Sequence, residues 1–197
     1  MNGQVFTLFP ELLYLNEVDL KDLTFNEEDF KFVSNKFNST TESTDILLDE
    51  KYNDLKAQLQ WHVDFYFYNV LKVVPATKIF ITESWINKTV KNEFHHLHRH
   101  GNSIVSGIVY LNDAHPSGVT KFSSGKYSTL SFEYTEHNQF NAIQFGVSPK
   151  KGRLVLFPSS LHHETDLYKG DESRLTLSFN TFVQGKINQT NTQYLVL

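Results

Sequence analysis

Apolar side chains recur at helical spacing in one stretch of the chain and at strand spacing in several later stretches. The helical stripe consists of Leu48, Tyr52, Leu55, Leu59, Val63, Tyr66 and Val70. Spacings of three and four place these residues on one face, which predicts an amphipathic helix over Leu48–Lys72. Asp45 or Asp49 is suited to cap its start. His62 lies beside the stripe and is expected at the edge of a helix–sheet interface.

After Pro75 the pattern changes to short runs rich in β-branched and aromatic residues. The runs predict strands at Lys78–Ile86, Ser103–Leu111, Thr129–Tyr134, Ala142–Val147, Arg153–Phe157 and Arg174–Phe182. Residues typical of turns separate them, and this arrangement is typical of a sandwich or barrel. We therefore expect a mainly β fold with flanking α structure. The expected form is a double-stranded β-helix, the cupin-like jelly roll, with the helix buttressing one sheet.

The two ends of the chain are less regular. Phe6–Pro10 predicts a first short strand that ends at proline, and Asp19–Phe37 predicts a short helix. The polar segment Ser39–Asp45 is typical of a loop. Near the other end, the polar segment Asn188–Gln193 precedes Tyr194–Leu197, which either returns as an edge strand or stays loose.

The composition is that of one globular domain. The chain has 197 residues, 40% of them hydrophobic, and 17 Phe and 9 Tyr raise the aromatic content to 14%, which suits packing on pleated sheets. We expect one domain over 1–197, in which 1–75 supplies a strand and helices, 76–183 the jelly-roll core and 184–197 a tail.

Charge and cysteine content exclude several classes of function. The formal net charge of −4 gives no electrostatic reason to bind nucleic acid. The chain has no cysteine, so disulfides, thiolate zinc sites and iron–sulfur clusters are excluded. We see neither a secretory leader nor an apolar run long enough to span a membrane. A soluble, cytoplasmic protein is expected.

Two histidine clusters lie at the ends of strong predicted strands. His96, His98 and His100 share parity in the string FHHLHRH, so an extended chain turns all three to one side and His95 to the other. The pair His162-His163 follows a strand that is stopped by proline. Two imidazoles of one cluster and a third from the other can converge on one ion, and imidazole suits zinc, copper, iron and nickel. Three histidines with open positions are typical of a catalytic rather than a structural metal site.

Arg174 begins the predicted strand RLTLSFN, whose side chains alternate between two faces. An arginine pointing into a barrel is costly to desolvate unless an anion meets it, and its guanidinium matches a carboxylate in bidentate fashion. The alternative is a surface arginine, free or paired with Glu164 or Asp171.

The segments SWIN, SGIVYLN, KKGRLVLFPSSLHHET and RLTLSFN follow one another in this order, with the histidine cluster after the first. This order, over roughly residues 80–182, resembles the iron(II)- and 2-oxoglutarate-dependent oxygenases. It is most similar to the small 2OG-Fe(II) oxygenase family of bacteriophages and bacteria, which is distantly related to prolyl 4-hydroxylases.

The resemblance implies a set of metal ligands. His98 matches the first ligand of that family, and His163, not His162, matches the distal one. The usual 2-His-1-carboxylate triad has Asp or Glu two residues after the first histidine. Here that residue is His100, so the third ligand is a neutral imidazole. His96 and His98 are the alternative pair.

The resemblance also implies the residues that bind the cosubstrate. Arg174 matches the arginine that holds the C5 carboxylate of 2-oxoglutarate, and Tyr110 matches a tyrosine that bonds the same carboxylate. Asn180 and Trp85 lie in matching motifs and are further candidates. No catalytic side chain is expected beyond the metal centre.

The implied activity is that of an iron(II)- and 2-oxoglutarate-dependent dioxygenase. It uses O2 to hydroxylate a C–H bond of a peptide or small molecule, and it releases succinate and CO2. Two alternatives stay open. One is a cupin-like three-histidine metalloenzyme that does not use 2-oxoglutarate. The other is an inactive metal-binding or structural module of the same fold.

Overall fold

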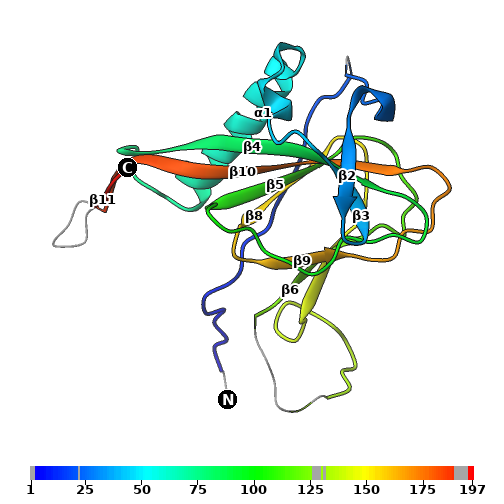
Figure 1. Ribbon diagram of the computed structural model, residues 1–197. Helices are drawn as coiled ribbons and strands as arrows, with labels where there is room; N and C mark the ends of the chain where they lie inside the picture. The colour runs from blue at the N-terminus through cyan, green and yellow to red at the C-terminus, as the bar shows by residue number, and fades with distance from the viewer. Residues whose placement is uncertain (1–2, 22, 126–129, 131, 189–194) are drawn as a thin grey trace.

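Two antiparallel sheets and one main helix build the protein (Figure 1). The computed structural model describes residues 3–21, 23–125, 130, 132–188 and 195–197. Within them the large sheet has the order β1-β8-β5-β10-β4-β3-β2, with β11 also paired to β10, and the small sheet has the order β7-β6-β9. The strands are β1 (Tyr14–Glu17), β2 (Phe32–Asn35), β3 (Asn38–Thr41), β4 (Thr77–Thr89), β5 (Val105–Tyr110), β6 (Thr120–Ser123), β7 (Gln144–Val147), β8 (Arg153–Pro158), β9 (His162–Thr165), β10 (Arg174–Ile187) and β11 (Leu195–Val196).

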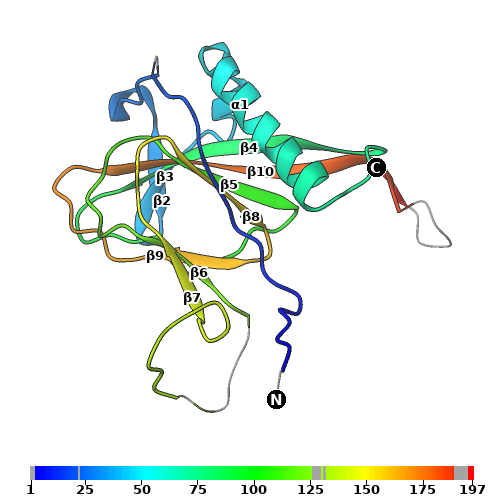
Figure 2. The same cartoon turned by 180° about the vertical axis from the view of Figure 1, so that it is seen from behind.

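The predicted helix is confirmed, and Figure 2 shows it lying across one face of the large sheet. It begins with 3-10 turns at Ile46–Leu48 and Glu50–Tyr52, continues as α1 (Asn53–Asp64) and ends in a π-helical turn at Phe65–Val70. Of the two expected caps, Asp49 accepts a hydrogen bond from the Lys51 backbone N–H at 3.1 Å. The middle of the apolar stripe is buried against the sheet, whereas its two end residues are exposed.

His62 has the structural position expected of it. It is buried at the edge of the helix–sheet interface, and its Nδ1 lies 2.9 Å from the Tyr14 hydroxyl.

The central strands of the large sheet are buried on both faces, because each face packs against a different layer. Strand β10 illustrates this: Leu175, Leu177 and Phe179 join the core under α1. A second, smaller core lies on the other face, where Ile108 of β5 and Phe157 of β8 meet side chains of the small sheet. The site described below also lies between the two sheets.

The N-terminal predictions are wrong. Phe6–Pro10 forms no strand: the apolar side chains in this stretch are exposed, and the first strand is β1, which pairs with β8. The expected helix over Asp19–Phe37 is, in its described residues, a single 3-10 turn at Glu27–Asp29 followed by β2. Part of the expected loop Ser39–Asp45 belongs to β3. The physical reason is tertiary pairing, since β2 and β3 form a hairpin whose second strand pairs with β4.

Five of the six strands predicted after Pro75 are confirmed, with shifted ends. The sixth, Thr129–Tyr134, is not a strand in its described residues, and its other residues lie outside the described part. The short strands β6 and β9 were not expected. At the C-terminus, β11 pairs with β10, while the polar segment before it lies almost wholly outside the described residues. Within the described part of the chain, no helix has the length and apolar character that crossing a membrane requires.

Candidate metal centre

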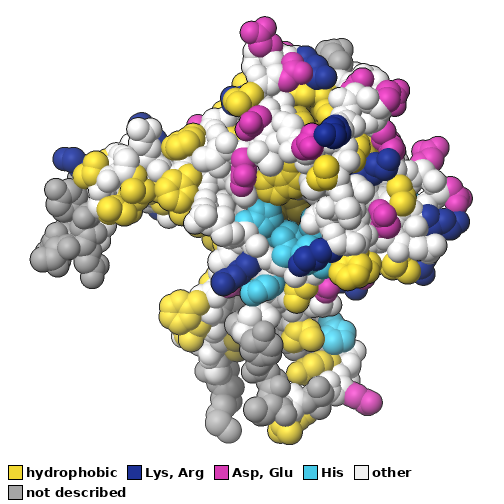
Figure 3. All heavy atoms as spheres, in the orientation of Figure 1, with side chains coloured by type: hydrophobic (Ala, Val, Ile, Leu, Met, Phe, Trp, Pro, Cys, Tyr) yellow, Lys and Arg dark blue, Asp and Glu magenta, His cyan; other side chains and the backbone are white. Residues whose placement is uncertain are grey.

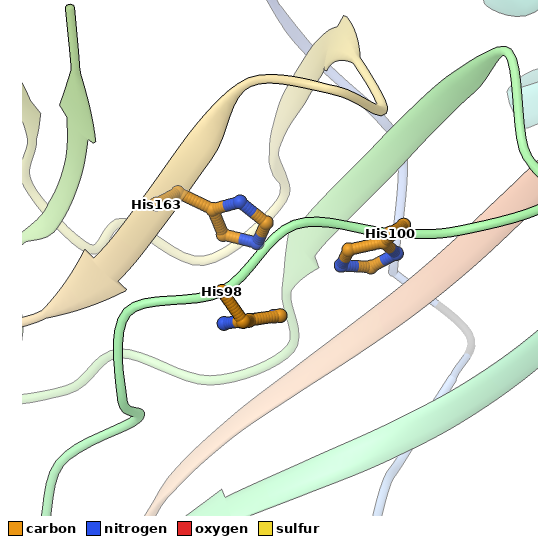
Figure 4. Close-up of side chains that lie close together, drawn as sticks. All are labelled: His98, His100 and His163. Carbon is orange, nitrogen blue, oxygen red and sulfur yellow. The ribbon is translucent and has the colours of Figure 1, made fainter. Parts of the chain in front are cut away.

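Three histidines from two segments meet between the sheets, as Figure 4 shows. His98 and His100 come from the connection between β4 and β5, and His163 comes from β9. The backbones of His98 and His163 bond to each other in both directions, at 3.0 and 2.9 Å. The His100 backbone N–H donates to the Ser159 carbonyl at 2.9 Å. One ring nitrogen from each histidine lies within 4.8 Å of the other two, so three imidazoles can share one ion.

Each of these imidazoles uses its Nδ1 atom for a hydrogen bond to an oxygen. The Nδ1 of His98 lies 2.7 Å from the His96 carbonyl, and that of His163 lies 3.1 Å from the Leu161 carbonyl. The Nδ1 of His100 lies 2.6 Å from Oδ1 of Asn180. Because all three partners are acceptors, each Nδ1 carries the proton and each Nε2 keeps its lone pair. The donor set therefore fits a divalent ion that imidazole ligates.

Burial keeps these imidazoles neutral. It lowers the pKa of His98 to about 4 and that of His163 to about 3, with neighbouring imidazoles as a further cause. Burial also lowers the pKa of His100, against the effect of its bond to Asn180. Only a neutral imidazole offers a lone pair to a metal. The site is therefore in its ligating form throughout the neutral pH range.

The parity expected for the histidine cluster is wrong at His95. Its ring stacks on His98 with 4.4 Å between centroids, and it lines the same pocket. The reason is a bulge: the backbone of His95 bonds to Thr165 and that of His98 bonds to His163. The three residue steps from His95 to His98 thus lie opposite only two steps of β9, from Thr165 to His163. The extra residue turns the side chains of His95 and His98 to the same side. His96 lies outside the ligand group, with its Nε2 atom 3.3 Å from Nζ of Lys36.

Arg174 lies in the same pocket, with its side chain turned inward. It is 2% exposed, and its Nη1 donates to the Gly118 carbonyl at 2.6 Å, while its Nε has no hydrogen-bond partner. No carboxylate of the described residues forms an ion pair with it, and Asp171 pairs with Lys91 instead. A buried, unpaired guanidinium is costly, so this end of the pocket is suited to an anion.

The other expected cosubstrate residues take three different positions. Trp85 lines the pocket, with its ring 5.6 Å from that of His100. Tyr110 does not line the pocket itself. Its buried hydroxyl lies 2.7 Å from Oγ1 of Thr120, and Thr120 lines the pocket. Asn180 bonds to His100, as described above, rather than lining the pocket itself.

Several polar residues that line the pocket were not predicted from the sequence. Thr176 and Ser178 share the face of β10 that carries Arg174, so the alternation of RLTLSFN contained the signal. Asn87 of β4 donates from Nδ2 to the Ser178 hydroxyl at 2.9 Å, and its buried Oδ1 has no partner. Asn87 lies in the segment SWIN, but the resemblance assigned a role there to Trp85 alone. Figure 3 shows histidine side chains gathered in a hollow of the surface.

No carboxylate of the described residues joins the three-histidine group. Glu164 lines the pocket, but its Oε1 lies 3.5 Å from Nε2 of Gln144. Asp166 forms an ion pair with Lys121 at 2.6 Å. The geometry thus brings together His98, His100 and His163, the three histidines that the resemblance implies as ligands.

Solved structures share this fold. A 2OG-Fe(II) oxygenase family oxidoreductase from Burkholderia pseudomallei has a TM-score of 0.56 at 12% identity, over 79% of this chain and 73% of that one. A prolyl-4-hydroxylase from Pseudomonas putida has a TM-score of 0.52 at 17% identity, over 78% of each chain. HygX from Streptomyces hygroscopicus, with nickel and 2-oxoglutarate bound, has a TM-score of 0.52 at 15% identity, over 78% and 74%. The expected jelly roll is confirmed.

The sequence itself matches one family. No curated protein matches the chain. Residues 83–180, however, match the family model described as "Putative 2OG-Fe(II) oxygenase". This span contains the three histidines, Arg174 and Asn180. The segment 83–180 therefore matches the 2OG-Fe(II) oxygenase family, and the resemblance inferred from the sequence is confirmed.

Proposed function

We propose that this protein is an iron(II)- and 2-oxoglutarate-dependent dioxygenase that hydroxylates a C–H bond of a peptide or small molecule. The balanced reaction converts substrate, 2-oxoglutarate and O2 to hydroxylated substrate, succinate and CO2. The observation that carries the proposal is one pocket with two complementary ends. Three neutral imidazoles converge at one end, and an unpaired guanidinium lies at the other.

Each end has its own task. His98, His100 and His163 hold the metal through Nε2, since their Nδ1 atoms are engaged. When bound, iron(II) supplies the redox chemistry that 2-oxoglutarate and O2 require. Arg174 holds the C5 carboxylate of the cosubstrate through a charge-assisted hydrogen bond from its free Nε. Tyr110 supports this end through its bond to Thr120.

The remaining wall orients the ligand and excludes water. Trp85 and Ile108 add apolar surface beside the histidines, and the unpartnered Oδ1 of Asn87 can accept a hydrogen bond. The cavity measures about 20 Å³, which holds about one water. A five-carbon dicarboxylate therefore needs a wider pocket than this one. All these residues lie within the expected core segment 76–183.

The neutral ligand set favours one second candidate, a three-histidine metalloenzyme that does not use 2-oxoglutarate. The deciding experiment measures metal content, and then succinate formed from 2-oxoglutarate under O2, with and without iron(II). Iron-dependent succinate release supports the dioxygenase. Stoichiometric metal without 2-oxoglutarate binding or turnover favours the second candidate. Failure to bind a divalent metal refutes both and leaves a module that only keeps the fold.

A further inference from the structure

A chain of hydrogen bonds leads from the candidate metal centre to a carboxylate on β4. The Nδ1 of His100 donates to Oδ1 of Asn180 at 2.6 Å, and Nδ2 of Asn180 donates to Oε1 of Glu83, also at 2.6 Å. Glu83 and Asn180 are direct partners in the register of β4 and β10. Among the residues that the structure describes, no lysine or arginine pairs with Glu83. Its charge is therefore not neutralised by an ion pair.

The carboxylate determines the orientation of the Asn180 amide. An ionised Glu83 can only accept hydrogen bonds, so the NH2 group of Asn180 must face it. Oδ1 of Asn180 then faces His100 and, as an acceptor, requires the proton of that ring to be on Nδ1. The Nε2 lone pair is left free for a metal. A reversed amide would place an oxygen against the carboxylate and an NH2 group against Nδ1, which would favour the opposite tautomer.

The other partners of Asn180 do not fix its orientation. Ser106 donates to Oδ1 at 2.7 Å and lies 2.8 Å from the Ser159 hydroxyl, which in turn donates to Ser103 at 2.7 Å. The hydroxyl of Ser106 can either donate or accept, so this residue can serve either orientation of the amide. His100 can reverse as well, by changing tautomer. Of the groups bonded to Asn180 through its side chain, Glu83 is the one with fixed polarity.

We propose that Glu83 is a positioning residue that acts through Asn180 to hold His100 in its Nδ1–H tautomer and to bring negative charge toward a site with three neutral ligands. Partners bonded to the outer nitrogen of a ligating histidine fix the orientation of the ring and raise its basicity. Glu83 thereby supplies, two hydrogen bonds away, part of the charge that a carboxylate ligand would bring. The effect on metal affinity rests on the proposed function, whereas the effect on the tautomer does not.

The first test uses the metal-free protein. Imidazole ¹⁵N chemical shifts report the tautomer of His100 directly. The wild type is expected to show Nδ1–H alone, and Glu83→Ala is expected to show a mixture or the opposite tautomer. Glu17→Gln is the matched control, because it removes one charge from a surface ion pair with Lys150, and it should leave the tautomer unchanged. A single Nδ1–H tautomer in Glu83→Ala would overturn the proposal.

The second test measures nickel(II) affinity. We expect Glu83→Ala to lose about tenfold or more, as is usual when such an outer partner is removed, and Glu83→Gln to lose less. The double variant Glu83→Gln/Asn180→Asp places the carboxylate directly on His100, with the new amide on β4 donating to it. It should recover most of the affinity lost in Glu83→Gln, which a merely structural role would not predict.

The outcomes separate the two proposals. If Glu83→Ala fails to fold, the comparison of Glu83→Gln with the double variant decides, and absence of recovery overturns the charge role. If the wild type binds no nickel(II) but the tautomer responds as expected, the proposed function fails and the positioning role stands. Nickel(II) affinity within about twofold of wild type in a folded Glu83→Ala contradicts the charge role.

Discussion

Removal of the Arg174 guanidinium should weaken 2-oxoglutarate binding without affecting metal binding. The side chain is buried, and its Nε is free for a carboxylate. A hydrogen bond to a charged group contributes about 2 kcal/mol or more once water is excluded. Arg174→Ala should therefore lose at least about thirty-fold in affinity. Arg174→Lys should recover only part of this, because an ammonium lacks the planar fork. Metal content should stay constant, since Arg174 is not in the ligand group.

The assay compares two ligands under anaerobic conditions with iron(II) present. One ligand is 2-oxoglutarate, and the other is 2-oxobutyrate, which lacks the distal carboxylate. If Arg174 recognises that carboxylate, Arg174→Ala loses affinity for the first ligand alone. Arg174→Met controls for the lost volume, and Lys91→Ala controls for the loss of an exposed cation that does not line the pocket. Equal losses for both ligands, or wild-type affinity for 2-oxoglutarate, would refute the assignment.

Three further predictions follow from the geometry. His163→Ala should abolish stoichiometric metal binding, while His162→Ala, which removes the exposed neighbour, should retain it; metal analysis after dialysis checks both. Burial lowers the pKa of the pocket histidines, so the unfolded chain takes up protons first as pH falls below 6.5. Each such histidine then lowers the free energy of unfolding by up to about 1.4 kcal/mol per pH unit. Urea unfolding of the metal-free protein from pH 7 to 5 should show this decrease, and a free energy of unfolding that does not change with pH would contradict it. A Cβ on Gly107 would lie 2.1 Å from Cζ of Phe179, so Gly107→Ala should lower the free energy of unfolding by about 1–3 kcal/mol, and an unchanged denaturation midpoint would disprove this.

The parts of the fold that were predicted correctly are those whose burial is visible in the sequence. The stripe of α1 and the alternation in β10 each repeat with the period of their own element, and β5 and β8 carry continuous apolar runs typical of buried strands. Strand β9, with the sequence HHET, has no such period. It is a strand because it pairs with β6, where Phe122 lies opposite His163. Pairing between segments far apart in the chain leaves no local signal, so such strands escaped prediction.

The same distinction applies to the site. The resemblance identified His98, His100 and His163, and the structure brings their ring nitrogens together. The position of His95 was wrong because the parity rule assumes a regular strand, and a bulge against β9 breaks that regularity. Glu83 could not be found from the sequence, because its importance depends on which residue of β10 lies opposite it.

Strand β10 contributes one face to the hydrophobic core and the other face to the candidate site. Leu175, Leu177 and Phe179 fill the core under α1, and the alternate residues from Arg174 to Asn180 face the pocket side. The positions of Arg174 and of Asn180, which bonds to His100, are thus both set by the register of β10 in the sheet. A shift of one residue would turn the polar side chains toward the core and the apolar ones toward the pocket. Since the sheet cannot accept that exchange, the burial of the leucines also fixes the position of Arg174 relative to the three-histidine group. The geometry of the candidate site is therefore held by hydrophobic packing on the opposite face of the same strand.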